Sequence, residues 1–330
     1  MMYRIPILLV VSSIINFLAY WGAFVYGNQD DSLKIDYSQA EIFDALSNQT
    51  MGDDCETKGG MSYEKGLKVW CWGDIEIPVY KGKSYSNLYQ NQLSIASECS
   101  EGQVSIEGHR LKFDLNPMQP KAGEWCSNSY NMRAEISTSP WLVKHPIGTE
   151  EWFGWRYTLG ENYIIDRANP WLFFQIHEGT SGEVPLISLW SVNQGGPGTG
   201  IAGEIHLVNS AGENASKYYP TGLIPKAGQS FDVVVHVVWG DDKSGLLQVW
   251  IDDRLVHDKK LRTVRASNPV GGNAKWGIYK WPWRNLTGVH SSQKQGIENL
   301  VTYMGSLRMI TRDPNDPSYL ENSYNEVNPR

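Results

Sequence analysis

The sequence predicts an all-β fold, either a sandwich or a barrel. After about residue 65, short apolar runs recur between clusters of Gly, Asn, Asp and Pro, which is typical of strands joined by turns. The clearest case is a hairpin: the runs 231–239 and 246–251 are rich in β-branched and aromatic residues, and turn formers fill 240–245. Long helical periodicity is not evident in the mature chain, where 38–46 is the best short helix candidate.

The N-terminus predicts a secretory signal peptide over residues 1–27. Arg4 precedes an almost uncharged stretch that ends in Val25-Tyr26-Gly27, where signal peptidase needs small or compact residues. We therefore expect a secreted protein with no stable membrane association once the signal is cleaved. An uncleaved signal anchor stays an alternative, because roughly 20 apolar residues can span a bilayer.

The rest of the chain predicts one domain over 28–311, because no internal repeat and no linker is evident. Residues 312–330 are rich in Asp, Asn, Pro and Ser, and we expect them to form a poorly ordered polar tail. A glycine-rich segment, 193–200, joins two strand-like runs and lacks the strand-then-helix setting of a phosphate-binding loop. We interpret it as a flexible loop that could cover a cleft.

Cysteine and asparagine patterns fit an exported protein. The four cysteines are Cys55, Cys71, Cys99 and Cys126. They predict two disulfide bonds with three pairings open, and no Cys-x-x-Cys or histidine pair at ligand spacing supports a zinc site. Three glycosylation sequons begin at Asn48, Asn214 and Asn285 and fit a glycoprotein of a eukaryotic secretory route.

Composition excludes one class of partner and leaves another open. The net charge is −7, from 36 acidic and 29 basic side chains without a basic block, so we expect no binding to nucleic acid. A few basic side chains in a cleft can still attract a polyanion. The 14 Trp and 17 Tyr, against 8 Phe, favour rings with a polar group, which suit both sugar-stacking surfaces and sandwich cores.

Candidate functional residues come from three apolar segments that carry polar side chains two or four residues apart. Such spacing places them on one face of a strand. The pairs are Arg133 with Glu135, Gln175 with His177, and Lys275 with Tyr279. Each pair alone has a structural explanation, such as an ion pair, a core histidine or a rim tyrosine. On neighbouring strands, however, they would line one cationic groove, and Gly277 would leave room there for a ligand or another backbone.

These segments resemble the Arg-x-Glu, Gln-Ile-His and Lys-x-Gly-x-Tyr motifs of β-jelly-roll polysaccharide lyases, and their order along the chain is the same. The runs 152–155 and 245–252 are more similar to the glucuronan lyase and heparin lyase group than to alginate lyases. The resemblance covers about 130–310 and implies a concanavalin-like β-jelly roll: two antiparallel sheets with a concave substrate groove. Ala134 and the run 281–283 depart from the alginate lyase pattern, which puts alginate in doubt as the substrate.

The resemblance also implies a reaction, the β-elimination of a 4-linked uronic-acid polysaccharide of glucuronan or alginate type. Arg133 and Gln175 would hold the carboxylate, with Lys275 adding positive charge and Glu135 belonging to the same binding set. His177 and Tyr279 would transfer the protons, and which of them is the base depends on the configuration at C5. We expect a monomer that binds an acidic polysaccharide.

No cofactor is required for the elimination itself. Some lyases of this group carry calcium, so a structural calcium ion stays open, but the acidic pairs at 241–242 and 252–253 are typical of ordinary turns. The alternatives are a non-catalytic lectin of the same fold and, less favoured, a β-glucanase. A retaining glucanase needs two carboxylates about 5–5.5 Å apart, and the sequence offers only Asp74-Ile75-Glu76.

Overall fold

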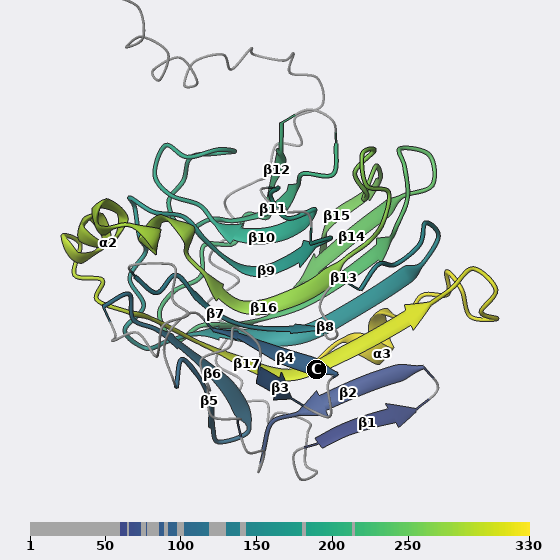
Figure 1. Ribbon diagram of the computed structural model, residues 1–330, viewed down its shortest axis with the longest axis horizontal. Coiled ribbons are helices and arrows are strands. Elements are labelled where there is room, and N and C mark those ends of the chain that lie inside the picture. The colour runs from purple at the N-terminus through teal and green to yellow at the C-terminus, as the bar shows by residue number, and fades with distance from the viewer. Residues whose placement is uncertain are drawn as a thin grey trace, which may run out of the picture. The chain divides into compact units, whose positions relative to one another are not determined.

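Two antiparallel sheets form a jelly-roll sandwich, as the sequence predicts (Figure 1). The computed structural model describes residues 60–64, 66–73, 77, 86–88, 92–97, 102–118, 130–138, 143–179, 183–212 and 215–330. The predicted signal peptide, the short helix at 38–46 and the pair Asp74 and Glu76 lie outside these residues. So do Cys55, Cys99 and Cys126, and the disulfide bonds therefore stay a prediction.

One sheet has nine strands within the described residues, in the order β1-β2-β17-β8-β13-β14-β15, with β6 pairing with both β17 and β5. Its strands are β1 (Gly60–Glu64), β2 (Leu67–Cys71), β5 (Val104–Glu107), β6 (Arg110–Leu115), β8 (Glu150–Leu159), β13 (Ser230–Val238), β14 (Leu246–Ile251), β15 (Arg254–Lys260) and β17 (Leu300–Arg312). The pairing of β13 with β14 confirms the predicted hairpin. Asp252 and Asp253 form the next turn with φ of 48° and 63°, a conformation that Asp tolerates.

The other described sheet has eight strands, in the order β12-β11-β10-β9-β16-β7-β4-β3. Its strands are β3 (Ser86–Leu88), β4 (Leu93–Ser97), β7 (Arg133–Thr138), β9 (Trp171–His177), β10 (Ile187–Ser191), β11 (Ile205–Asn209), β12 (Lys217–Pro220) and β16 (Asn273–Tyr279). The three strands that carry the polar pairs are therefore direct neighbours, in the order β9-β16-β7, although 95 residues of chain (178–272) lie between the end of β9 and the start of β16.

The core lies between the sheets and is largely aromatic. Trp155, Phe174 and Trp276 are fully buried, and Trp155 and Phe174 pack with ring centroids 4.9 Å apart. Burying one such ring contributes about 4–6 kcal/mol of transfer free energy. Much of the tryptophan content therefore serves the core. Alternation sends many intervening side chains to the opposite face, except where the register shifts, as in β9, whose Phe173 and Phe174 both pack in the core.

Short helices follow the last strand of the site. A 3₁₀ helix, η2 (Trp281–Arg284), comes directly after β16 and leads into α2 (Leu286–Gln293). Asn285 caps α2 by accepting a hydrogen bond from the backbone N–H of Gly288 at 3.0 Å. Within the part of the chain that the structure describes, no helix is long and apolar enough to cross a membrane.

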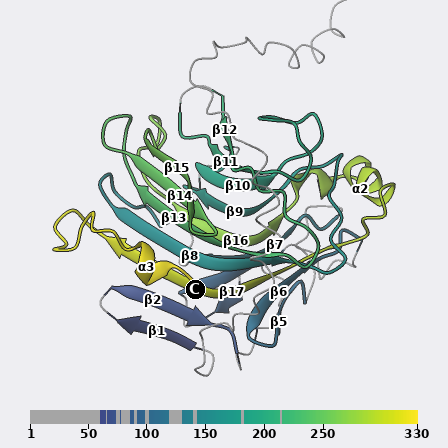
Figure 2. The same cartoon turned by 180° about the vertical axis from the view of Figure 1, so that it is seen from behind.

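The segment 312–330 is ordered, so the expectation of a disordered tail is wrong. It contains α3 (Tyr324–Val327), which packs on β8 and β17 and lies over them in Figure 2. Val327 is fully buried, and its carbonyl oxygen would lie 1.8 Å from a Cβ on Gly154, so only glycine fits there. Arg330 forms ion pairs with Asp232 and with both turn residues, Asp252 and Asp253.

Candidate active site

A row of polar side chains crosses the face of the eight-stranded sheet that points away from the core. The strand register places one residue of each of five neighbouring strands side by side. These residues, which we call the polar row, are Ser188, Gln175, Lys275, Ser137 and Ser94. Each is at most 5% exposed, so the ammonium group of Lys275 lies in a weakly screened environment.

Glu135 joins two of the predicted substrate-binding residues. Its Oε1 accepts a hydrogen bond from Nε2 of Gln175 at 2.6 Å, and its Oε2 lies 3.2 Å from Nε of Arg133. Glu135 is fully buried, whereas the Arg133 side chain is 20% exposed. A buried carboxylate with such partners fixes the orientation of both side chains. Glu135 is therefore placed to orient its neighbours.

Tyr279 lies beside this group. The guanidinium carbon of Arg133 is 4.4 Å from the centre of the Tyr279 ring, which is a cation–π distance. The ring is half-buried, and within the described residues its phenol oxygen has no hydrogen-bond partner. The phenol is therefore available to a ligand, and a cation faces its ring.

Gly277 allows this arrangement through its backbone. Its φ is +129°, and a Cβ there would lie 2.3 Å from the carbonyl oxygen of Ala134. Of the two roles that the sequence left open for Gly277, the structure supports close approach by another backbone. The carbonyl oxygen of Gly277 accepts a hydrogen bond from the buried hydroxyl of Tyr157 at 2.9 Å, which holds this irregular point of β16 in place.

His177 ends β9, and both of its ring nitrogens contact the protein. Nδ1 accepts a hydrogen bond from the N–H of Gly179 at 2.8 Å, so Nε2 carries the proton and donates it to the carbonyl oxygen of Glu183 at 3.2 Å. Burial lowers the pKa of His177, and the charge of Lys275 lowers it further, whereas the Glu178 carboxylate opposes them. The imidazole is thus neutral near pH 7, and its lone pair faces an amide of its own chain.

The two predicted proton-transfer residues are not in direct contact. Asn273 is the register partner of His177, and Tyr279 follows it by six residues on β16. The pairing of β16 with β9 shifts register between Trp276 and Tyr279, so β16 is not a regular extended strand over this stretch. The structure therefore places Tyr279 with Arg133, Gln175 and Glu135, while His177 lies further along the same face beside Asn273.

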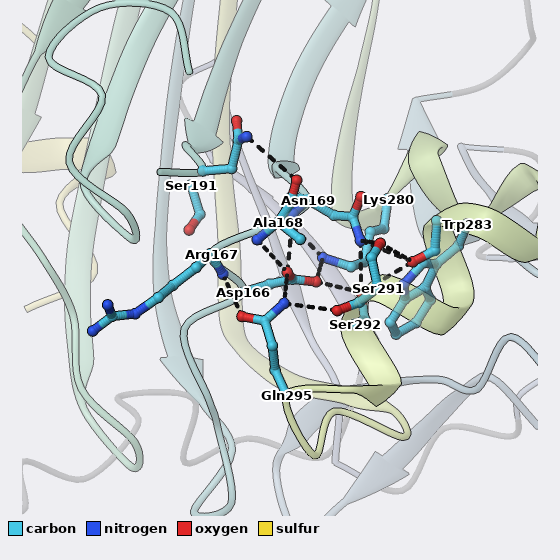
Figure 3. A network of polar contacts seen from close by, with 12 residues as sticks. Asp166, Arg167, Ala168, Asn169, Ser191, Lys280, Trp283, Ser291, Ser292 and Gln295 are labelled. Atoms are coloured by element: carbon cyan, nitrogen blue, oxygen red, sulfur yellow. Dashed lines mark hydrogen bonds and ion pairs between the residues drawn. The ribbon is translucent and has the colours of Figure 1, made fainter. Parts of the chain in front are cut away.

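Lys280, the residue after Tyr279, belongs to a buried polar network that the sequence did not reveal (Figure 3). Nζ of Lys280 is 2.9 Å from Oδ2 of Asp166, and both side chains are at most 3% exposed. Asp166 also accepts hydrogen bonds from Ser292 and Gln295. Burial lowers the pKa of Lys280, and Asp166 opposes that shift. The network fastens the chain after Tyr279 to α2 and to the loop before β9.

No group of three or more His, Cys, Asp or Glu side chains in the described residues could hold a metal ion. The acidic pairs noted in the sequence instead form turns. Oδ1 of Asp241 accepts hydrogen bonds from two backbone N–H groups at 3.0 Å. Asp252 and Asp253 pair with Arg330. The question of structural calcium stays a prediction.

Comparison with known proteins gives a family match. A family model described as polysaccharide lyase matches residues 82–304, a range that includes β7, β9 and β16. No curated protein sequence matches the chain.

Solved structures with a similar fold include an endo-β-1,4-glucuronan lyase from the fungus Trichoderma reesei. It is 14% identical, covers 71% of this chain and 90% of its own, and has a TM-score of 0.44. An alginate lyase from Pseudomonas aeruginosa is 17% identical, covers 62% of this chain and 83% of its own, and has a TM-score of 0.43. At such distances a likeness does not transfer a substrate.

Proposed function

Because the chain belongs to the polysaccharide lyase family and is a polysaccharide lyase, we propose that it cleaves a 4-linked uronic-acid polysaccharide by β-elimination. One observation carries this proposal: Arg133, Gln175, Lys275 and Tyr279 lie on one face of three neighbouring strands. In the reaction a base takes the proton from C5, the C4–O4 bond breaks, a C4=C5 double bond forms, and O4 receives a proton. The product carries an unsaturated uronate end.

Carboxylate neutralisation is the first requirement, because the carbanion at C5 is stabilised only through the adjacent carboxyl group. Arg133 offers planar N–H donors, and buried Lys275 adds a positive charge that water screens little. Gln175 keeps one amide N–H and its carbonyl oxygen beyond the bond to Glu135. These groups would stabilise the negative charge that grows on the carboxylate in the transition state.

Tyr279 would carry out both proton transfers when the C5 proton and O4 lie on the same side of the sugar. Its hydroxyl is available to the substrate, and the Arg133 guanidinium that would bind the carboxylate lies over its ring. His177 would act as the base for sugars with the opposite C5 configuration, once the N–H of Gly179 releases its Nδ1. Burial favours the neutral form of His177 that this role needs.

The test is ultraviolet absorbance of the unsaturated uronate during incubation with glucuronan, polymannuronate, polyguluronate and heparin in separate reactions. Tyr279→Phe should lower turnover by about 10²–10⁴-fold while polymer binding persists. The matched control is Tyr303→Phe, which alters a half-buried tyrosine on the nine-stranded sheet. Binding to a polymer without any rise in absorbance would reject the proposal in favour of the lectin.

A second pair of variants separates the two proton-transfer roles. His177→Phe should abolish elimination only for polymers whose C5 proton and O4 lie on opposite sides. His290→Phe, at an exposed position on α2, is the control. If His177→Phe loses the same share of turnover on every polymer, Tyr279 does not carry out both proton transfers without His177.

We also propose that the enzyme acts outside the cell as a monomer and needs no cofactor. The N-terminal stretch 1–27 supports export. Sequencing the N-terminus of the protein from culture medium should find residue 28 first, whereas a membrane-bound protein that retains Met1 would indicate the signal anchor. Activity that survives a chelator would support elimination without a metal.

A further inference from the structure

Four aromatic side chains form a continuous row on the polar face of the eight-stranded sheet, next to the proposed active site. Ring centroids of Tyr279 and Trp281 are 5.9 Å apart, those of Trp281 and Trp190 are 4.6 Å apart, and those of Trp190 and Tyr218 are 5.6 Å apart. We call these four residues the aromatic row. They come from β16, η2, β10 and β12, so segments far apart in the sequence assemble it.

The row differs from the tryptophans of the core. Trp155, Trp276 and Trp283 are fully buried, whereas all four rings of the row are half-buried and keep part of their surface in solvent. A partly exposed aromatic cluster bordered by polar side chains is typical of a ligand surface. The polar row lies on the same sheet face: Ser188, its member on β10, is two residues before Trp190.

The rings are also held in place before any ligand binds. Nε1 of Trp190 donates a hydrogen bond to Oγ of Ser188 at 2.6 Å. Trp281 is the first residue of η2, directly after Lys280, whose ammonium group is fixed by buried Asp166 (Figure 3). Fixed side chains lose little conformational entropy on binding.

We propose that the aromatic row is a stacking surface for pyranose rings, and that it selects uronans whose sugars are joined through equatorial bonds. Its ligand, a uronic-acid polymer, rests on the proposed function. Neighbouring ring planes are inclined by 47°, 55° and 81°, so the row is not one flat platform and each ring would contact a sugar separately. Stacking requires a sugar face that presents C–H groups, and β-linked glucuronate and mannuronate present three axial C–H groups on one face. Guluronate in its usual chair has both linkage oxygens axial, so its chain is bent and lacks such a flat face.

The row and the proton-transfer site select the same sugars. In β-linked glucuronate and mannuronate the C5 proton and O4 lie on the same side, and that is the case in which Tyr279 alone would serve as base and acid. Tyr279 is also the first ring of the row. A sugar stacked against Trp281 would therefore be next to the sugar at Tyr279.

The experiment measures binding and turnover of Trp190→Ala and Trp281→Ala in the full-length protein, using affinity electrophoresis in gels that contain one polymer each. Loss of one stacking ring should weaken binding to glucuronan or polymannuronate by about three- to tenfold. Polyguluronate should retard the wild-type protein less than these two polymers. Trp281→Phe should restore most of the affinity, because it keeps an aromatic ring.

Trp250→Ala is the matched control, since Trp250 is a half-buried tryptophan of β14 on the other sheet. It should leave polymer binding unchanged, and thermal melting confirms that each variant is folded. Unchanged affinity and KM in both Trp190→Ala and Trp281→Ala would overturn the stacking surface, even if wild-type elimination is seen. Loss of binding in these variants without elimination by the wild type would support the stacking surface and reject only the lyase reaction proposed above.

Discussion

Replacing Gly277 with alanine should destabilise the protein for two separate reasons. The φ of +129° lies in a region that residues with a side chain rarely adopt, which costs about 1–3 kcal/mol. The new Cβ would also lie 2.3 Å from the carbonyl oxygen of Ala134 and 2.8 Å from Cα of Glu135. Both are backbone atoms, so β16 and β7 must move apart, at a further cost of about 1–3 kcal/mol. We expect a total loss of about 2–6 kcal/mol.

Urea unfolding followed by tryptophan fluorescence measures this loss. Gly102→Ala is the matched control, because Gly102 has a φ of +73° but nothing lies within 4 Å of its Cβ position. The control isolates backbone strain and should cost about 1 kcal/mol. Elimination by Gly277→Ala should fall as well, since Tyr279 follows two residues later. If Gly277→Ala unfolds at the same urea concentration as Gly102→Ala, the close approach of the backbones is not the reason for glycine here.

Three further predictions concern buried ionisable side chains. Burial lowers the pKa of His257 to about 4, below its ordinary 6.5, so between these pH values the unfolded chain binds a proton at His257 and the folded chain does not. The free energy of unfolding should therefore fall by about 3 kcal/mol as pH drops from 6.5 to 4. Urea unfolding of His257→Gln should show a smaller fall over the same pH range, and an equal fall would contradict this assignment. Asp166→Asn leaves the Lys280 charge buried without its partner and should lower the free energy of unfolding by about 3–5 kcal/mol in the same assay. A double variant that adds Lys280→Met should recover part of this stability. No recovery would argue against the ion pair as the cause. Glu135→Gln should lower kcat/KM by about 10- to 100-fold in the absorbance assay, because the Glu135 carboxylate orients the side chains that would bind the substrate carboxylate. The control Glu107→Gln, at an exposed position, should leave kcat/KM unchanged. Equal kcat/KM values for the two variants would refute this role of Glu135.

Local pattern was enough to predict the features that repeat every two residues. Strand alternation predicted the hairpin of β13 and β14 and placed Gln175 and Lys275 on polar faces, and the structure confirms both. The sequence could not show that β16 lies between β9 and β7, because that order depends on how the whole chain packs. The resemblance to jelly-roll lyases implied a common groove but not this strand order.

Other features depend on contacts that leave no local signal. Trp190 and Trp281 belong to segments 91 residues apart, and nothing in either segment indicates that their rings meet. Asp166 is one of many loop aspartates until Lys280 is brought beside it. The polar segment 312–330 has the composition of a disordered tail, but buried Val327 and the ion pairs of Arg330 hold it on the nine-stranded sheet.

The polar row also bears on how the chain finds its fold. Side chains alternate along a strand, so a shift of β16 by one residue would move the ammonium group of Lys275 into the aromatic core and put Trp276 on the outside. Burying that charge without a partner is costly enough to reject the shifted pairing. An apolar residue at position 275 would remove this penalty, and only the exposure of core residues such as Trp276 would then oppose the shifted pairing. The lysine proposed to attract the substrate thus also disfavours a one-residue misalignment of the sheet.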